Sequence, residues 1–468
     1  MSQGAFSLLA PFYPGIAEKE KGLSSFIIGM VMSSFSVSFV IASYIVGIKI
    51  SKIGRRFTLY SGIILQSLSM IGFGLIVWID NKILFIILSF AFRLLGGTAC
   101  SFICVAAYAM VAIKYRENVQ AKISLLEAAN GAGLFVGPIF GGLIYQFTHF
   151  CVPFFLFTGI FLAFIPFMKR ALTPDLDVDD NKESDSNRIG YFKLLKHKRV
   201  FFAAMTQFFN IWWFTFGQPI FGPRLSDEYG FSDAIIGVCF ALPTVTYILT
   251  GPIFLPLITK KFEWRATIMV GFFILIISCL FIGPSRLLGF PQTSSAMMII
   301  GLGILGCGAA FTVIPVIPEM LSAVEGKYLE NASEVSDNFS GIFNVAGGFG
   351  QIIGPTIAGL LKDEIGFNYT FDFLTLSVLA FNIIYIVIWG GITSMGRSFK
   401  ATMMRWKKDA TLTDTSASHQ LLNEESDTPD EAEYPTKREV NDDETRQESI
   451  DTSTDISYTN NSNSYTIN

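Results

Sequence analysis

The stretch Gly131-Ala-Gly-Leu-Phe-Val-Gly-Pro-Ile-Phe-Gly-Gly142 lies inside an apolar segment that is too long for an ordinary core helix. Five glycines and one proline would normally break a helix. Inside a bilayer they are tolerated, because neighbouring helices satisfy the backbone groups that they free. Glycines at helical spacing (Gly133, Gly137 and Gly141) let a second helix approach closely, and Pro138 should bend the segment. The stretch therefore predicts a bent, closely packed membrane helix.

The same pattern recurs 217 residues later, in Gly347-Gly-Phe-Gly-Gln-Ile-Ile-Gly-Pro-Thr-Ile-Ala-Gly359. Its Gly350, Gly354, Pro355 and Gly359 match Gly133, Gly137, Pro138 and Gly142. A second echo, at an offset of 208, relates Ile27-Ile-Gly29 to Ile235-Ile-Gly237. Two halves with matching segments indicate a duplicated transporter fold.

Three motifs resemble those of the major facilitator superfamily. The antiporter motif of its fifth helix is similar to Gly133-x-x-x-Gly-Pro-x-x-Gly-Gly142. Its loop motif between helices two and three is similar to Gly47-Ile-Lys-Ile-Ser-Lys-Ile-Gly-Arg-Arg56, and its fourth-helix arginine motif is similar to Arg93-Leu-Leu-Gly96. Three further stretches resemble the vesicular amine transporter branch, especially its polyamine transporter-like members: Ala10-Pro-Phe-Tyr-Pro14, Lys21-Gly22 and Leu126-Glu127. The resemblance implies a drug:proton antiporter type.

The composition points to an all-α membrane protein. Of the 468 residues 51% are hydrophobic and only 15% are charged, whereas a soluble domain carries about 25% charged residues. A spanning helix needs about 20 apolar residues, and twelve segments meet or approach that length. They lie near 1–16, 26–48, 57–79, 83–113, 123–147, 152–168, 200–222, 233–258, 266–284, 295–318, 338–361 and 371–394. We expect two pseudo-symmetric six-helix bundles with a shortened first helix.

Four regions follow from this reading: an N-terminal bundle over 1–170, a linker over 171–199, a C-terminal bundle over 200–395 and an acidic disordered tail over 396–468. Loops on the linker's side carry 24 Lys and Arg, and the opposite loops carry six. This bias places the linker and the C-terminus in the cytosol. The short segment Tyr191-Phe-Lys-Leu-Leu195 is expected to form an amphipathic helix.

Few ionisable groups lie inside the predicted spans, and each costs about 2.5–3.5 kcal/mol to insert, so each is a candidate for function. Glu127 in the fifth helix, flanked by Asn130, can bind a proton or a cationic amine in turn. Arg93 could hold Glu127 ionised until a proton or substrate competes. The alternatives are a purely structural Glu127–Arg93 pair and a packing role for Arg93.

Two further positions depend on the internal repeat and on the resemblance. Asn344 is the pseudo-symmetric partner of Glu127, at a place that resembles one held by an acid in vesicular monoamine transporters. Since asparagine carries no charge, a strict copy of that mechanism is in doubt. Glu319 resembles an acidic position of the same branch, although it could also be an ordinary acid of a cytosolic loop.

The predicted seventh helix carries a cluster of amides and indoles. Gln207, Asn210 and Trp213 are candidates for binding an organic cation, because aromatic faces attract ammonium groups. Tryptophans are also common as interface anchors. In the loop motif the family's usual acid, which in relatives joins the two halves through a charge contact, is replaced by Ser51. Lys52, Arg55 and Arg56, beside Gly47 and Gly54, are then left to bind anionic lipid or the acidic run of the linker.

These observations predict a secondary transporter that exchanges protons for an organic cation, an amine or polyamine, by alternating access. The alternatives are a multidrug or organic-anion carrier, with Arg93 facing the substrate, and a transporter-like sensor. We do not expect the protein to be an enzyme, or to have a cofactor, a metal site or a nucleic-acid partner. The sequence contains no phosphate-binding loop, nucleophile–histidine arrangement or Cys/His cluster. We expect a multi-pass monomer in the membrane of a vesicle or another acidic organelle, with protons, substrate and lipid as partners.

Overall fold

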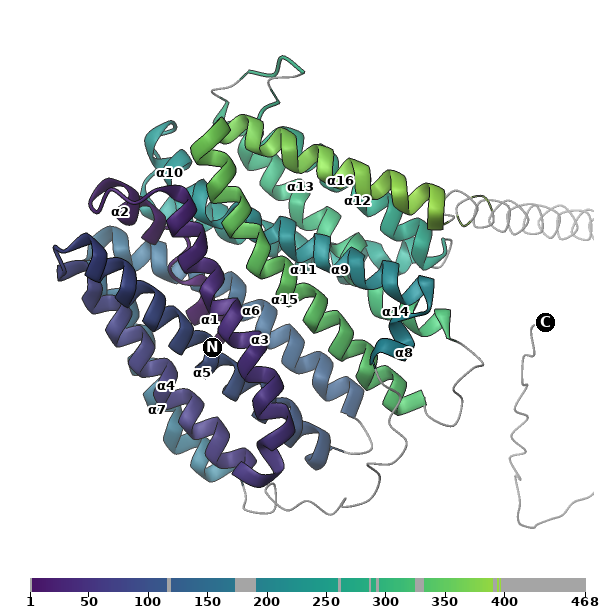
Figure 1. Cartoon of the computed structure of the whole chain (residues 1–468), viewed down its shortest axis with the longest axis horizontal. Coiled ribbons are helices and arrows are strands. Elements are labelled where there is room, and N and C mark those ends of the chain that lie inside the picture. Colours follow the sequence, from purple (N-terminus) through teal and green to yellow (C-terminus); the bar gives the residue numbers. More distant parts are fainter. Residues whose placement is uncertain are drawn as a thin grey trace, which may run out of the picture. The chain divides into compact units, whose positions relative to one another are not determined.

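The structure is a computed structural model that describes residues 2–115, 119–172, 191–259, 262–285, 288–291, 294–324 and 332–389, with Ser394 and Gly396. Most of the expected linker and nearly all of the expected acidic tail lie outside the described residues. Within the described residues every regular element is a helix (Figure 1). The all-α prediction is therefore confirmed.

The N half, residues 2–172, contains the first set of helices. They are α1 (Ser2–Ser7), α2 (Tyr13–Lys19), α3 (Ser25–Ile53), α4 (Arg55–Leu75) with the short 3₁₀ turn η1 (Ile76–Trp78), α5 (Lys82–Lys114), α6 (Val119–Phe147) and α7 (Cys151–Ala171). Gly54 separates α3 from α4 with a φ of 93°, a backbone conformation that favours glycine.

The C half, residues 191–389, repeats this order. Its helices are α8 (Tyr191–Leu195), α9 (Lys198–Phe216), α10 (Gln218–Asp227), α11 (Asp233–Thr259), α12 (Trp264–Ile282), α13 (Ser295–Val313), α14 (Val316–Ala323), α15 (Ala332–Ile365) and α16 (Phe367–Trp389). The short helix expected from Tyr191 to Leu195 is present as α8.

Three segments that the sequence presents as single helices are each divided in two. The breaks lie between α1 and α2, between α9 and α10, and between α13 and α14. A proline lies at each break: Pro11, Pro219 and Pro315. Proline has no backbone N–H to donate, so the helical hydrogen-bond ladder is interrupted there.

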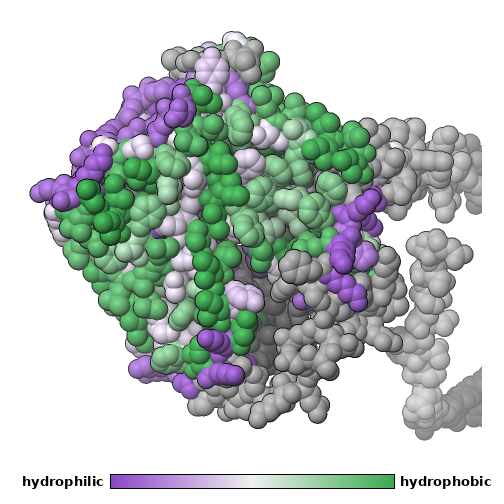
Figure 2. Space-filling model, viewed as in Figure 1, coloured by the Kyte–Doolittle hydropathy of each residue, from purple (hydrophilic) through white to green (hydrophobic). Residues whose placement is uncertain are grey.

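Eight segments of the described part are long and apolar enough to cross a membrane. The four expected segments outside that set are α1–α2, α6, α9–α10 and α15, and they form two repeat-related pairs. The surface agrees, because a broad hydrophobic band separates hydrophilic residues at the edges of the visible face (Figure 2).

Each half has its own large apolar core. One large cluster of buried residues runs from Ala5 to Phe161, and another runs from Trp212 to Tyr385. Phe240 packs against both clusters. Its position on α11 marks the place where the two halves meet.

The halves meet along two helix pairs, α3 with α15 and α6 with α11, and the first pair runs side by side through the centre of Figure 1. The contacts depend on glycine. A Cβ on Gly29 would overlap the carbonyl oxygen of Pro355, and a Cβ on Gly237 would approach that of Pro138. Gly29 and Gly237 are repeat mates, as are Pro355 and Pro138, so both helix pairs use the same close contact.

Gly133, Gly137 and Gly141 of the opening stretch bring α6 against α1 and the residues that follow it within the N half, whereas Gly142 meets Asp233 and Gly237 of α11. A Cβ on Gly137 would approach the carbonyl oxygen of Gly4, and one on Gly141 would overlap that of Leu8. The prediction that these glycines admit a second helix is confirmed, and that helix is α1. In the C half, Gly354 approaches the backbone of α9 in the same way.

Candidate functional site

A cavity lies between the two halves, near the middle of the described helices. In the N half it is bounded by α6 and the chain around α1, and in the C half by α9, α10, α11 and α13. Its lining is Ser7, Ala10, Leu134, Pro138, Phe214, Gln218, Phe221, Phe240, Pro243, Thr244, Leu302 and Leu305. Three of these are aromatic, three are neutral and polar, and none is charged. The cavity can therefore surround an apolar or cationic group without presenting a competing charge.

Ion pairs connect the N half to the C half at one end of the interface between them. This closed end carries α2 and α10. Lys362 of α15 pairs with Glu18 of α2 at 2.7 Å, and Lys19 pairs with Asp227 of α10 at 2.5 Å. Each pair joins one half to the other.

Side chains also cap helices across the closed end. Asp363 of α15 accepts hydrogen bonds from the backbone N–H groups of Ser25 (3.1 Å) and Phe26 (2.8 Å), in the first turn of α3. Gln146 of α6 accepts one from the N–H of Ala234, in the first turn of α11, at 3.0 Å. These N–H groups have no acceptor within their own helices, so the caps hold the halves together at this end.

The opposite end of the interface, which carries α8, is called the linker end. Gly348 of α15 faces Val40 of α3. Asn344 lies one helical turn nearer the linker end on the same stripe of α15, and it is exposed. Asn344 therefore borders the space between the halves instead of being enclosed.

Glu127 lies in α6, but its side chain is outside the described residues. Its position along the helix is informative all the same. Leu134 and Pro138 of α6 line the cavity, and residue 127 lies seven positions before Leu134, which is two turns or about 10 Å along the same face. Glu127 thus occupies the stripe of α6 that leads from the linker end to the cavity.

The helix register excludes a Glu127–Arg93 pair. Asn130 of α6 donates a hydrogen bond to the hydroxyl of Tyr108 on α5 at 2.9 Å. From Tyr108 to Arg93 is 15 residues, about 22 Å towards the closed end, whereas Glu127 lies beyond Asn130 in the opposite direction. Two side chains cannot span that distance, so the pairing suggested by the sequence is wrong.

Arg93 is buried instead within the N half, with 4% of its surface exposed. Its guanidinium lies 4.6 Å from the ring centre of Phe35 and 5.4 Å from that of Phe6, and it donates a 3.4 Å hydrogen bond to the carbonyl of Met32. Cation–π contacts contribute about 0.5–2 kcal/mol each, whereas burying an ion costs several kcal/mol. These contacts leave much of the cost of burial uncompensated.

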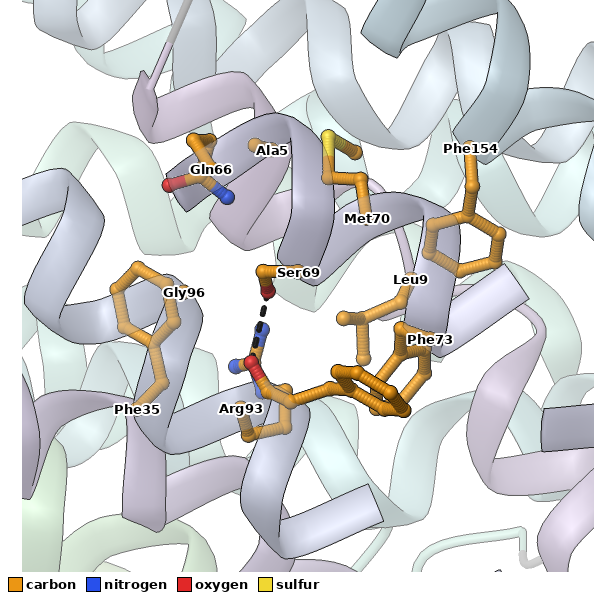
Figure 3. A pocket seen from close by; sticks show the side chains of 11 residues that line it. Ala5, Leu9, Phe35, Gln66, Ser69, Met70, Phe73, Arg93, Gly96 and Phe154 are labelled. Carbon is orange, nitrogen blue, oxygen red and sulfur yellow. Dashed lines mark hydrogen bonds between the residues drawn. The ribbon is translucent and has the colours of Figure 1, made fainter. Parts of the chain in front are cut away.

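A small cavity adjoins the Arg93 side chain (Figure 3). It is separate from the cavity between the halves and lies among α1, α3, α4, α5 and α7. Arg93 and Gln66 supply polar atoms to it, and Ser69 donates its hydroxyl hydrogen to the carbonyl of Phe92 at 2.7 Å.

The polar residues of α9 do not converge on the cavity between the halves. Trp213 donates its indole N–H to the Cys279 thiol of α12, and the Gln207 amide lies against Gly347 of α15. Asn210 is buried, and within the described part of the chain neither of its amide atoms has a hydrogen-bond partner. None of the three side chains lines the cavity, which is reached instead by Phe214 and Gln218.

Glu319 is the centre of an ion cluster at the linker end of the C half. Its side chain is 2% exposed and pairs with Arg199 of α9 at 2.8 Å and, at 3.6 Å, with Arg265 of α12. Ser322 donates a further hydrogen bond to the Glu319 carboxylate at 3.3 Å. The carboxylate therefore ties α14 to α9 and α12, and it does not line the cavity between the halves.

A comparison with protein families agrees with this architecture. The model of the Major Facilitator Superfamily matches residues 1–328, more than half of the chain. The chain belongs to the Major Facilitator Superfamily. Its duplicated helices and paired halves are those of a small-molecule transporter of that superfamily, and it is not an enzyme.

Individual relatives within the superfamily are more distant. The human MFS-type transporter SLC18B1 is 26% identical over 369 residues, which cover 79% of each chain. The human chromaffin granule amine transporter is 25% identical over 348 residues, covering 73% of this chain and 61% of its own. The solved structure of the nucleoside transporter NupG superposes with a TM-score of 0.62 at 11% identity, covering 83% of this chain and 97% of its own. The likeness to NupG concerns the fold alone.

The superfamily's loop motif lies at the linker end of the N half. Gly47 and Lys52 are exposed at the end of α3, while Arg55 is buried at the start of α4 and Arg56 is partly buried. Both arginines have interaction partners. The side chain of Ser51, which replaces the motif's acid, is outside the described residues.

Sequence reasoning missed several residues of the cavity between the halves and of the closed end. Phe221, Phe240 and Thr244 line the cavity, and Gln146 and Asp363 cap the helices. The 217-residue offset between the two glycine-rich stretches relates Gln146 to Asp363, so extending the repeat by four residues beyond Gly142 and Gly359 would have found this pair. The aromatic residues carry no such signal.

Proposed function

We propose that this superfamily member exchanges protons for an organic cation, an amine or polyamine, across the membrane of an acidic organelle. The observation that carries the proposal is the uncharged aromatic cavity between the halves, with Glu127 on the same face of α6 about two turns away. The names of the relatives are consistent with it, since one of them is called an amine transporter.

The cavity suits the apolar and cationic parts of an amine. Phe214, Phe221 and Phe240 surround it from the C half, and aromatic rings attract ammonium groups. Gln218 and Thr244 can accept hydrogen bonds from an ammonium group. An organic anion would find no cation in this lining.

The exchange step is assigned to Glu127. A carboxylate in a partly desolvated place binds either a proton or a cation, and both do not occupy it together. The helix register places Arg93 out of reach, so Arg93 does not neutralise Glu127, and that role falls to an amine or a proton. Asn344, its repeat mate, supplies a neutral hydrogen-bonding group from α15.

Alternating access requires the closed end to open while the linker end closes. The ion pairs Glu18–Lys362 and Lys19–Asp227 and the two caps hold the present state. With the linker in the cytosol, as the positive charge of the loops predicts, this state faces the cytosol and is ready to load substrate.

The test uses purified protein in liposomes with an acidic interior, and it measures uptake of radiolabelled spermidine and serotonin as a polyamine and a monoamine probe. Wild-type protein should accumulate at least one probe, and a protonophore should abolish the accumulation. Glu127→Gln should reduce uptake to the level of empty liposomes. Glu364→Gln is the matched control, because Glu364 is an exposed acid at the closed end.

Other outcomes would select a different function. Full uptake by Glu127→Gln would reject the exchange role of Glu127. Uptake of an organic anion such as p-aminohippurate, in place of both amines, would favour the carrier alternative. A variant that ends at Lys408 separates a transporter from a sensor, since a transporter should still accumulate its substrate.

A further inference from the structure

The cavity beside Arg93 contains a buried cation without an anionic partner. Among the side chains that the structure describes, none with a carboxylate pairs with Arg93, and Glu127 lies too far along α6 to reach it. The ionisable groups within electrostatic range are the Tyr13 phenol and the Cys100 thiol. Both are normally neutral near pH 7. The positive charge is therefore not balanced by the protein around it.

Two polar groups at this cavity are buried and have no partner among the residues that the structure describes. The Nε of Arg93 donates no hydrogen bond, and the Oε1 of Gln66 accepts none. Both residues are at least nine-tenths buried, with 4% and 2% of their surfaces exposed, and Figure 3 shows both beside the same space. Buried polar atoms are normally satisfied, so two orphans at one cavity indicate that something occupies it.

The internal repeat shows that packing does not require this polar pair. Gly97 and Gly306 are equivalent, since a Cβ on either would overlap a carbonyl oxygen of the neighbouring helix, that of Phe35 or Pro243. Four residues before each glycine lies Arg93 in the N half and Leu302 in the C half. By the same 209-residue offset, Gln66 corresponds to Leu275.

The surrounding framework is otherwise the same in both halves. Ser69 donates to the carbonyl of Phe92 at 2.7 Å, and its repeat mate Ser278 donates to that of Gly301 at 2.8 Å. Leu302 and Leu275 are 1% and 2% exposed within the apolar core of the C half. Two leucines fill this framework in one half, so an arginine and a glutamine in the other half serve a purpose besides packing.

The size of the cavity limits its occupant. The volume open to the centre of a water-sized sphere is about 10 Å³, and a cavity needs about 10–15 Å³ on this measure to hold one water. An organic anion is excluded. A single small particle fits, and beside an unbalanced guanidinium a negative one is favoured electrostatically.

We propose that the Arg93 cavity binds one monatomic anion, chloride under cellular conditions, as a resident counter-ion of the N half. The Arg93 guanidinium supplies the charge, and the Gln66 amide, turned so that its NH₂ faces the ion, supplies a second donor. The site is separate from the cavity between the halves, so it holds whether or not the transported substrate is an amine.

The test measures the thermal unfolding of purified full-length protein in detergent, without any transport substrate. Sodium chloride, sodium bromide and sodium gluconate are compared at equal ionic strength. Wild-type protein should melt at a higher temperature in either halide, and the increase should saturate with halide concentration, because a ligand that binds only the folded state stabilises it. Gluconate is too large for the cavity and should give no such increase.

The matched variant is Arg93→Leu/Gln66→Leu, which copies the pair that the C half tolerates. It should fold, and its melting temperature should be the same in halide and gluconate. Arg93→Lys retains the charge and should retain a saturable halide effect, with an affinity reduced by tenfold or more. As a direct readout, line broadening of the ³⁵Cl resonance should occur with wild-type protein and disappear with the double variant.

Two results would overturn the proposal. If wild-type protein melts at the same temperature in chloride and gluconate and leaves the ³⁵Cl line unchanged, the cavity holds water. If the halide effect persists in Arg93→Leu/Gln66→Leu, the anion binds elsewhere. Should the double variant fail to fold, Arg93→Lys still tests the proposal. An unchanged halide affinity in that variant would contradict a site that depends on the Arg93 guanidinium.

Discussion

Gln146 and Asp363 are 217 residues apart in the sequence, and each caps a helix of the opposite half at the closed end of the interface. Gln146 accepts from the N–H of Ala234, and Asp363 accepts from that of Phe26. Ala234 and Phe26 are themselves related by the 208-residue offset. The internal duplication has therefore preserved a contact between the halves, while the capping side chain is neutral in one copy and charged in the other.

Removing the charged cap should loosen the closed end. Asp363→Ala leaves two first-turn N–H groups of α3 without an acceptor, and the loss of such a cap costs about 0.5–2 kcal/mol. Spin labels can be attached at Asp80→Cys and Leu288→Cys, two exposed loop positions of opposite halves. Double electron–electron resonance should then show a larger population of long distances between the two labels. Asp363→Asn retains an acceptor and should behave nearly as the wild type.

Gln146→Ala tests the neutral cap in the same way. It frees one N–H instead of two and removes no charge from the positive end of a helix, so its effect should be smaller than that of Asp363→Ala. Equal distance distributions for Asp363→Ala and the wild type would show that the caps do not hold the halves together.

The contact between Gly29 and Pro355 should not tolerate a methyl group. A Cβ at Gly29 would overlap a backbone carbonyl oxygen that cannot turn aside as a side chain can. Gly29→Ala should therefore separate α3 from α15 and depopulate the closed end, with the same spin-label pair as the readout. Gly303→Ala is the control, because a Cβ there meets nothing within 4 Å. A closed end that survives Gly29→Ala would mean that the helices can slide past each other at little cost.

The two ion pairs of the closed end should differ in strength. Lys19 and Asp227 are 50% and 46% exposed, whereas Lys362 and Glu18 are 20% and 35% exposed. Exposed pairs contribute about 0–1 kcal/mol and are screened by salt. Lys19→Ala should therefore have little effect on the closed population, and Lys362→Ala a larger one.

An exchange of charges checks that the interaction is electrostatic. Glu18→Lys alone places two positive charges together and should open the closed end, while Glu18→Lys/Lys362→Glu should restore it. The spin-label distances at low and high salt provide the measurement. Failure of the double exchange to restore closure would assign the effect to helix packing.

The Glu319 cluster should be more sensitive to the loss of its arginine than to the loss of its acid. Arg199→Met leaves a carboxylate that is 2% exposed with the longer contact to Arg265 and the hydrogen bond from Ser322, and removing one partner of a buried pair costs about 3–5 kcal/mol. Glu319→Leu leaves Arg199, which is 30% exposed and can be hydrated. Denaturation in mixed detergent micelles should rank Arg199→Met as the less stable variant. The reverse order would contradict a buried carboxylate.

The sequence predicted most of the helices and the duplication because those are local properties. Hydropathy over about 20 residues and the spacing of Gly133, Gly137 and Pro138 depend only on neighbours in the chain. The offset that relates this stretch to Gly350–Gly359 is also visible without coordinates. Where α1–α2 and α9–α10 divide, Pro11 and Pro219 gave a local signal that length alone obscured.

Which side chains meet could only be decided by the tertiary structure. Arg93 and Glu127 look like partners in the sequence, yet the Asn130–Tyr108 hydrogen bond fixes a register that places them more than 20 Å apart along the helices. Glu319, in contrast, meets two arginines from distant segments. Hydrophobic patterning sets the length of each helix, but contacts between helices depend on their axial shift and rotation. Those are fixed by glycine contacts, caps and packing across the whole fold.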